Sequence, residues 1–452
     1  MSPKHFLCAL AAGALLFCAV PQAQAQAQKL YPCGDVPNPS TSPRIAPIFH
    51  GNADLNDAGF DCMAWQDFIY LNWPATPGQR GVPNAGARFG APGPTVWETY
   101  KTADQVFLPN AQDPGAWNAA HMLATLATPL AERVANGEVR RLTMTSKISR
   151  AVLGNILLHS AAETAILDEI SQAGGGTLYD LNGYPVYYEI AMNRVQYDYI
   201  RGNKLYNAIE QIAFAQTRVI SLPAAPADGQ ESAVEIKAAW KVLSQAERAS
   251  GRFHTIEALL DGSKSPVTVG LVGFHMFVSN GAQGAWGTFA QIDNAPVKGG
   301  STSGSYNFFN PNCKQPGTSN PCPVNVKDAN PGQVLQINPN NQTATSLNAY
   351  MQAMLKSYDS KTPWQYYKLI DVQWALQPVE ISRLKAPVSV PLPDGSPNRK
   401  VVVNAVIETF VQSAGIGCFS CHTYATIAGS GSNKPPYASS YSFTFGRATT
   451  PK

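Results

Sequence analysis

The stretch VTVGLVGFHMFV, Val267–Val278, decides the fold class of this 452-residue chain. Its residues are nearly all apolar and rich in β-branched side chains, which predicts a buried central strand or an apolar helix. Upstream, Val234–Val242 alternates apolar and polar side chains, as a half-buried strand does. Residues 253–259 are expected to form another strand. The centre of the chain therefore predicts a sheet, with Val267–Val278 as its most buried candidate.

Helical patterns lie on both sides of these strands. The expected helices cover residues 63–72, 117–136, 147–172, 194–216 and 346–358. Residues 178–190 predict a hairpin with its turn at Asn182-Gly183, and residues 401–412 predict a strand that runs into a helix. This mixture, with long ordered loops, indicates the α+β class. A linker at residues 223–228 separates a loop-rich, helical part (26–222) from a mixed strand/helix part (229–452), as two units or one integrated domain.

The first 25 residues are typical of a secretory signal peptide. Lys4 precedes a 15-residue apolar run at residues 6–20, and small residues follow it, so cleavage is expected after Ala25 or Ala27. The apolar run is shorter than the roughly 20 residues that a membrane-spanning helix needs. No later segment is long and apolar enough, so we expect a periplasmic protein without a transmembrane segment in its mature chain.

Charged residues make up only 14% of the chain, compared with about 25% in a typical globular protein. The formal net charge is +3, and loss of Lys4 with the signal peptide leaves +2. Nucleic-acid binding requires a concentrated basic surface, so this composition argues against it.

Eight cysteines are present, and removal of the signal peptide would leave six. Two of these six belong to a motif described next. Four remain in an expected oxidising compartment, where disulfides form. The pairing Cys33–Cys62 and Cys313–Cys322 closes the shortest loops and is favoured, the alternative being that some of these thiols stay reduced and buried.

The sequence CFSCH at residues 418–422 has the C-x-x-C-H form that attaches haem c. Two thiols three residues apart can each form a thioether with one of the two vinyl groups on a porphyrin edge. The following His422 then becomes the proximal iron ligand, with Cys418 and Cys421 as the covalent attachment points. A thioredoxin-like pair or half a zinc site has the same pattern, but no βαβ unit or second ligand pair accompanies it here. The sequence thus predicts one covalent haem c per chain.

The position of this motif differs from that in small cytochromes c, where it lies near the start of the domain. Only 30 residues follow His422, and none of them is Met or His. We therefore expect the rest of the chain to build the haem site, in a fold other than the small cytochrome c fold. Upstream candidates for a sixth iron ligand are the histidines of the mature chain, His50, His121, His159, His254 and His275, and its methionines. His275 is the preferred distal candidate, because it ends an apolar run where an imidazole without a partner would be costly.

Several patches of the chain resemble a group of exported bacterial proteins described as cytochrome c family proteins, which carry a single C-terminal C-x-x-C-H motif. The patches are WQDFIYLNWP (65–74), GPTVWETYK (93–101), YEIAMN (188–193), VEIKAAW (234–240), residues 269–294, FFNPNC (308–313) and residues 404–422. The resemblance implies haem c at Cys418, Cys421 and His422, and it implies no particular substrate. The group usually has a basic residue shortly after its histidine, whereas this chain has Val278-Ser279-Asn280.

Two classes of function follow from a single haem c. The first is a periplasmic electron-transfer cytochrome that meets a redox partner protein. The second is a haem-dependent peroxidase or oxygenase, or a gas-binding protein, with an open distal site and a small substrate. The size of the chain favours a substrate pocket, while the absence of a second haem motif favours the simple carrier.

Overall fold

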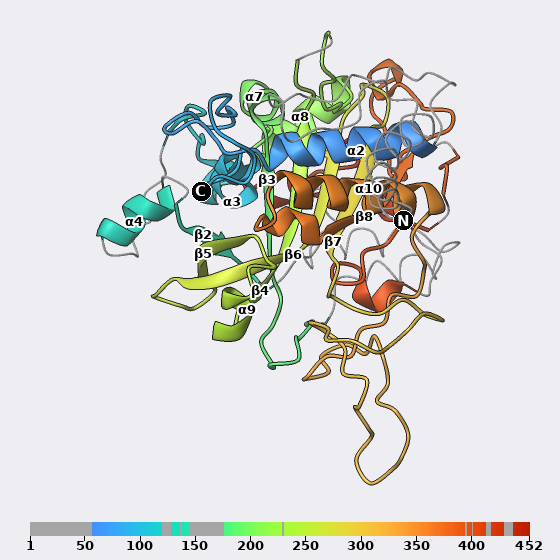
Figure 1. Ribbon diagram of the computed structural model, residues 1–452. Helices are drawn as coiled ribbons and strands as arrows, with labels where there is room; N and C mark the ends of the chain where they lie inside the picture. The colour runs from blue at the N-terminus through green and yellow to red at the C-terminus, as the bar shows by residue number, and fades with distance from the viewer. Residues whose placement is uncertain are drawn as a thin grey trace, which may run out of the picture.

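The computed structural model describes residues 57–119, 128–135, 138–144, 176–227, 230–393, 396–399, 401–412, 417–428 and 437–452. Helices and one curled, mixed eight-stranded sheet make up this part of the chain (Figure 1). The predicted α+β class is confirmed. Strands from both sides of residues 223–228 join the same sheet.

The sheet has the order β1-β3-β4-β6-β5-β2, and β7 pairs with both β6 and β8. All neighbours are antiparallel except β2 and β5, which are parallel. The strands are β1 (Lys101–Thr102), β2 (Arg140–Leu142), β3 (Tyr187–Met192), β4 (Val234–Val242), β5 (Thr255–Leu260), β6 (Val267–Val278), β7 (Ala285–Gln291) and β8 (Tyr367–Trp374).

Strand β6 is the centre of the sheet, which settles the choice between strand and helix for Val267–Val278. One edge of β6 pairs with β4, while the other pairs first with β5 and then with β7. The sheet therefore splits along this edge and curls. Thr143, just after β2, exchanges backbone hydrogen bonds with Tyr188 of β3 and links the two ends of the curl.

The described helices are mostly short. They are α2 (Asp57–Leu71), α3 (Ala103–Val106), α4 (Thr128–Ala135), α7 (Arg194–Gly202), α8 (Ala208–Thr217), α9 (Gln245–Ala249), α10 (Gln342–Tyr358) and α11 (Cys418–His422). The predicted helices at residues 63–72 and 346–358 correspond to α2 and α10, each of which begins several residues earlier than expected. Of the helix expected at 117–136, the part from residue 128 is α4, and the helix expected at 147–172 lies outside the described residues.

The expectation of one helix over residues 194–216 was wrong, because the chain breaks into α7 and α8. Lys204 has a positive φ of 55°, which a helix cannot contain. The side chain of Asn207 then accepts a hydrogen bond from the Ile209 amide and caps α8. The apolar periodicity ran through this break, since both helices bury side chains against the same core.

The expectation of a strand and helix over residues 401–412 was also wrong, since the segment is irregular except for a 3-10 turn at Thr409–Val411. Its apolar side chains pack on a face of the sheet instead of pairing at an edge. Gly273 of β6 makes room for them, because a Cβ there would lie 2.9 Å from Val406 and 3.1 Å from Ile407. Asn404 replaces strand pairing with hydrogen bonds from its amide to Phe289 O and Thr288 Oγ1.

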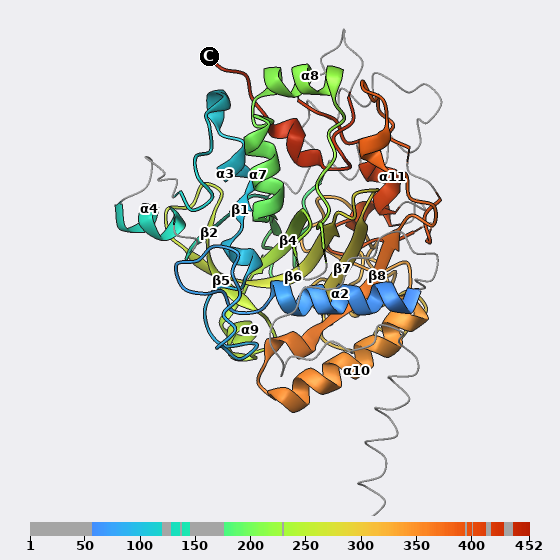
Figure 2. The same cartoon turned by 90° about the horizontal axis from the view of Figure 1, so that it is seen from above.

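The two faces of the sheet are covered differently. Helices α2 and α10 cover one face, where Phe68 stacks on Phe289 with 4.2 Å between ring centroids and meets Phe274 edge-on. Trp65 of α2 donates to Asn348 of α10 and joins the two helices. The C-terminal segments cover the opposite face, and Figure 2 shows α11 across the strands from α2 and α10.

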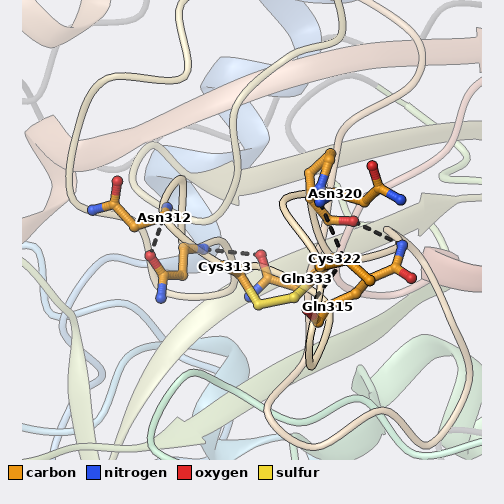
Figure 3. Close-up of a disulfide and its surroundings, with 9 residues drawn as sticks. Asn312, Cys313, Gln315, Asn320, Cys322 and Gln333 are labelled. Carbon is orange, nitrogen blue, oxygen red and sulfur yellow. Dashed lines mark hydrogen bonds between the residues drawn. A yellow bond between two sulfur atoms is a disulfide. The ribbon is translucent and has the colours of Figure 1, made fainter.

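The predicted disulfide Cys313–Cys322 is confirmed (Figure 3), and it lies in the loop-rich segment between β7 and α10. The Cys322 amide donates to Cys313 O, and Gln315 pairs with Asn320 across the same loop. Cys62 is also disulfide-bonded, but its partner lies outside the described residues, so Cys33–Cys62 stays a prediction. The expected signal peptide lies outside them as well, and no helix within them is long and apolar enough to cross a membrane.

Candidate functional site

The C-x-x-C-H motif forms a single helical turn, α11, anchored to the sheet by its second residue. Phe419 is buried and contacts Trp286 of β7, with ring centroids 4.6 Å apart. Its amide donates to Gln373 Oε1 of β8 over 2.8 Å. Gly417 precedes the turn, and a Cβ there would collide with the same Gln373 side chain. The sequence GCFSCH therefore folds as a short turn that β7 and β8 hold by one aromatic ring and one amide.

His422 is fixed by a backbone carbonyl. Its Nδ1 lies 2.6 Å from Tyr441 O, and its ring packs beside Phe443. Burial lowers the pKa of His422 to about 4, so the imidazole is neutral at pH 7. A carbonyl oxygen only accepts hydrogen bonds, so Nδ1 carries the proton and Nε2 keeps its lone pair. An imidazole held this way has the tautomer and orientation of a metal ligand.

Both cysteines of the motif are thiols, without a disulfide between them. Residues three apart in a helical turn lie on one face, so the two sulfurs are presented together. Burial raises the pKa of the Cys418 thiol well above its ordinary value, so the thiol is protonated at pH 7. Two reduced thiols and an oriented neutral imidazole are the groups that a covalently attached haem requires, so these residues fit the cofactor.

A polar row crosses the sheet on the face that α11 covers. Lys237 of β4, His275 of β6, Thr288 of β7 and Asp371 of β8 are successive register partners. Directly opposed residues of antiparallel strands share a face. Trp286 lies two residues before Thr288 on β7, and Gln373 lies two residues after Asp371 on β8, so both side chains that hold α11 are on this same face.

His275 is paired with a carboxylate from the C-terminal segment. Its Nε2 lies 3.1 Å from Glu408 Oε1, and the two side chains are 15% and 23% exposed. The Asn404 amide donates to the other oxygen of Glu408 over 2.8 Å. Burial alone would raise the pKa of Glu408, but His275 and Lys237 outweigh it and hold the pKa below its ordinary value.

The charges of Lys237 and His275 affect the pKa of His422 in the motif. After burial, the neighbouring charges of Lys237 and His275 also contribute to the low pKa of His422. Burial in turn lowers the pKa of the Lys237 ammonium itself. A carboxylate, an imidazole and a half-buried lysine therefore lie on the sheet face next to the candidate haem site.

The motif residues and the preferred distal candidate come together on this face. Cys418, Cys421 and His422 share α11, and His275 lies on the same side of the sheet. His254 does not, because its Nε2 bonds Glu98 on the α2 side, 2.5 Å away. His50, His121 and His159 lie outside the described residues.

Sequence reasoning missed Glu408, Lys237 and the carbonyl of Tyr441. No motif contains them, and their roles arise from contacts between segments distant in sequence. The alternation of polar residues on β4 was the one available signal, because it placed Lys237 on a face opposite the apolar core.

Comparison of the chain with protein-family models, with curated proteins and with solved structures gave no match.

Proposed function

We propose that this chain is an exported, periplasmic monohaem c-type cytochrome that transfers electrons. Cys418 and Cys421 would hold the haem through thioethers, and His422 would be the proximal iron ligand. The observation that carries the proposal is the contact between His422 Nδ1 and Tyr441 O, because it leaves Nε2 available to iron. The resemblance of the sequence to cytochrome c family proteins agrees with it.

The bound haem would supply one-electron redox chemistry. The chain's own residues would position the haem-attachment motif and orient the His422 imidazole. Phe419, Trp286 and Gln373 hold the motif against β7 and β8. Tyr441 O sets the imidazole tautomer, and its hydrogen bond makes the imidazole a stronger electron donor to the metal.

The redox partner would be another protein that docks near α11. A net charge close to zero gives little long-range electrostatic steering. Docking would therefore depend on local contacts around the C-terminal segments.

Cysteine substitutions test the attachment. In a host that exports the chain and attaches haem c, we expect one covalent haem in the wild type and a shifted pyridine haemochrome band in Cys418→Ala or Cys421→Ala, which would keep one thioether. Ser420→Ala is the matched control, because it changes a motif position without a proposed bond. An unshifted band and full attachment in both single variants and their double variant would refute the proposal.

The His275–Glu408 pair favours a second candidate function, a haem-dependent peroxidase or oxygenase, or a gas-binding protein. Such proteins need an open distal site, and the enzymes also need a positioned acid/base. His275 with its carboxylate partner, beside Lys237, is a group of that kind.

The optical spectrum of the ferric protein separates the two functions. A six-coordinate, low-spin spectrum that cyanide and imidazole leave unchanged supports the carrier. A high-spin spectrum that shifts when either ligand is added supports the enzyme or gas-binding function and contradicts the carrier.

A further inference from the structure

A cavity of about 270 Å³ lies away from the motif, between the loop at residues 90–95, the start of β5 and the 3-10 turn Pro363–Tyr366. Its walls include Thr95, Phe253, His254 and Trp364. Trp364 packs edge-on against Phe68 of α2, with ring centroids 5.6 Å apart. The cavity therefore belongs to the α2 side of the sheet, opposite the face that carries α11.

A buried carboxylate holds two of the wall residues. Glu98 Oε1 lies 2.5 Å from His254 Nε2, and Glu98 Oε2 accepts the Thr95 amide over 2.8 Å. Burial alone would raise the pKa of Glu98, but His254, Thr95 and Arg140 outweigh it and hold the pKa below its ordinary value. Glu98 is thus ionised, so His254 Nε2 carries a proton and donates it to the carboxylate.

The other nitrogen of His254 remains open. The imidazole stacks on Trp364, with 4.5 Å between the ring centroids and 23° between the ring planes, and this contact fixes the plane of the imidazole. Among the described residues, Nδ1 has no hydrogen-bond partner, so it can bond a ligand. The arrangement resembles other carboxylate-oriented imidazoles, whose free nitrogen faces a ligand.

Thr95 offers a second polar atom at the same place. Its side chain is 4% exposed, and its Oγ1 has no hydrogen-bond partner within the described part of the chain. A buried hydroxyl without a partner is costly, so Thr95 Oγ1 favours a ligand that can hydrogen-bond to it. Asn72, also in the wall, is satisfied, because its amide donates to Phe68 O and accepts from Trp97 Nε1.

The rest of the cavity wall restricts the charge and size of a ligand. None of its residues is Asp, Glu, Lys or Arg, so the wall offers no permanently charged side chain. Phe253 and Trp364 are the aromatic residues of the wall. The space beside Gly93 is open, because an added Cβ there would meet nothing within 4 Å. A volume near the low end of the roughly 300–1,000 Å³ of drug-sized sites suits a single ring.

We propose that this cavity binds a small, uncharged, hydroxylated ring compound of the phenol type. The ligand hydroxyl exchanges hydrogen bonds with His254 Nδ1 and Thr95 Oγ1, while its ring lies against Trp364. The site does not depend on the haem, because its polar groups, on His254 and Thr95, lie away from the motif beside Trp364 and Glu98.

Titration with phenol, and with benzene as the analogue without a hydroxyl, tests the site in the full-length protein. We expect saturable phenol binding with a shift of the His254 ring signals in nuclear magnetic resonance spectra, and at least tenfold weaker binding of benzene. Thr95→Val, which is nearly isosteric, should weaken phenol binding about tenfold and leave benzene binding unchanged. Thr217→Val, on an exposed helix face, should behave as the wild type.

Equal affinity for phenol and benzene, no saturable phenol binding, or full phenol affinity in Thr95→Val would overturn the proposal. The double variant Cys418→Ala/Cys421→Ala separates this site from the proposed haem. Phenol binding should persist in it, whether or not the chain carries haem. Loss of phenol binding in that variant, with its fold intact by circular dichroism, would show that phenol binds at the haem and would also contradict the site.

Discussion

His422 Nδ1 lies 2.6 Å from the carbonyl oxygen of Tyr441, so the chain returns to the motif 19 residues after leaving it. The same Tyr441 ring packs edge-on against Trp286 and Phe419. One residue of the C-terminal tail therefore orients the imidazole and closes the aromatic contacts that hold α11. The segment after the motif therefore has a structural role at the site.

Removal of the imidazole tests its role as iron ligand. His422→Ala should retain the thioethers but lose the spectrum of the wild type, because no other group takes the proximal position. Added imidazole should restore a spectrum close to that of the wild type. Ser420→Ala serves as the control, and a wild-type spectrum in His422→Ala without added imidazole would exclude His422 as the ligand.

His275→Ala tests the distal role of this residue. We expect a changed ferric spectrum or a changed cyanide affinity, because the variant loses the imidazole and leaves Glu408 without its neighbour at 3.1 Å. Met276→Leu, on the opposite face of the same strand, conserves volume and should match the wild type in both properties. If His275→Ala also matches the wild type in both, the distal assignment fails.

The disulfide Cys313–Cys322 is expected to stabilise its loop without affecting the motif. Closing a loop of about ten residues contributes about 2–3 kcal/mol by reducing the entropy of the unfolded chain. Cys313→Ser/Cys322→Ser should lower the free energy of unfolding in urea by up to this amount and leave the optical spectrum unchanged. A changed spectrum would mean that this loop reaches the haem site.

Asp61 should make the fold less stable as the pH rises. Burial raises its pKa to about 7, whereas the unfolded chain has a pKa near 4. The folded state therefore binds the proton more tightly, so its stability is highest below about pH 4 and falls as the pH rises to about 7. Asp61→Asn should remove this decline, which is at most about 4 kcal/mol. Urea unfolding at pH 5 and pH 8 measures the decline. An equal loss of unfolding free energy between these two pH values in the wild type and in Asp61→Asn would contradict the assignment.

Local patterns predicted the central strands well. The alternation in β4 and the apolar run of β6 specified two strands of the sheet, although the run alone could not exclude a helix. Strands β7 (AWGTFAQ) and β8 (YKLIDVQW) were not predicted. Each is buried on both of its faces, so its sequence does not alternate between apolar and polar residues. The segment 401–412 misled for the opposite reason: its β-branched residues pack against Gly273 on a sheet face, and no local pattern distinguishes this from a strand.

The candidate site, like the fold, was predictable only where it depends on local sequence. C-x-x-C-H is a local motif, so the sequence predicts Cys418, Cys421 and His422 together. The surroundings of the motif depend on register across the sheet, which places His275 opposite Lys237 and brings Glu408 to it from 133 positions further along the chain. Those contacts follow from the three-dimensional arrangement and have no signature of their own in the sequence.

The mass of the intact, denatured chain after expression with haem-attachment machinery tests the central claim most directly. The account predicts the mature chain plus one haem, and a thiol-alkylating reagent that adds nothing at Cys418 or Cys421. A chain without added haem mass, in which both of these cysteines are alkylated, would contradict it.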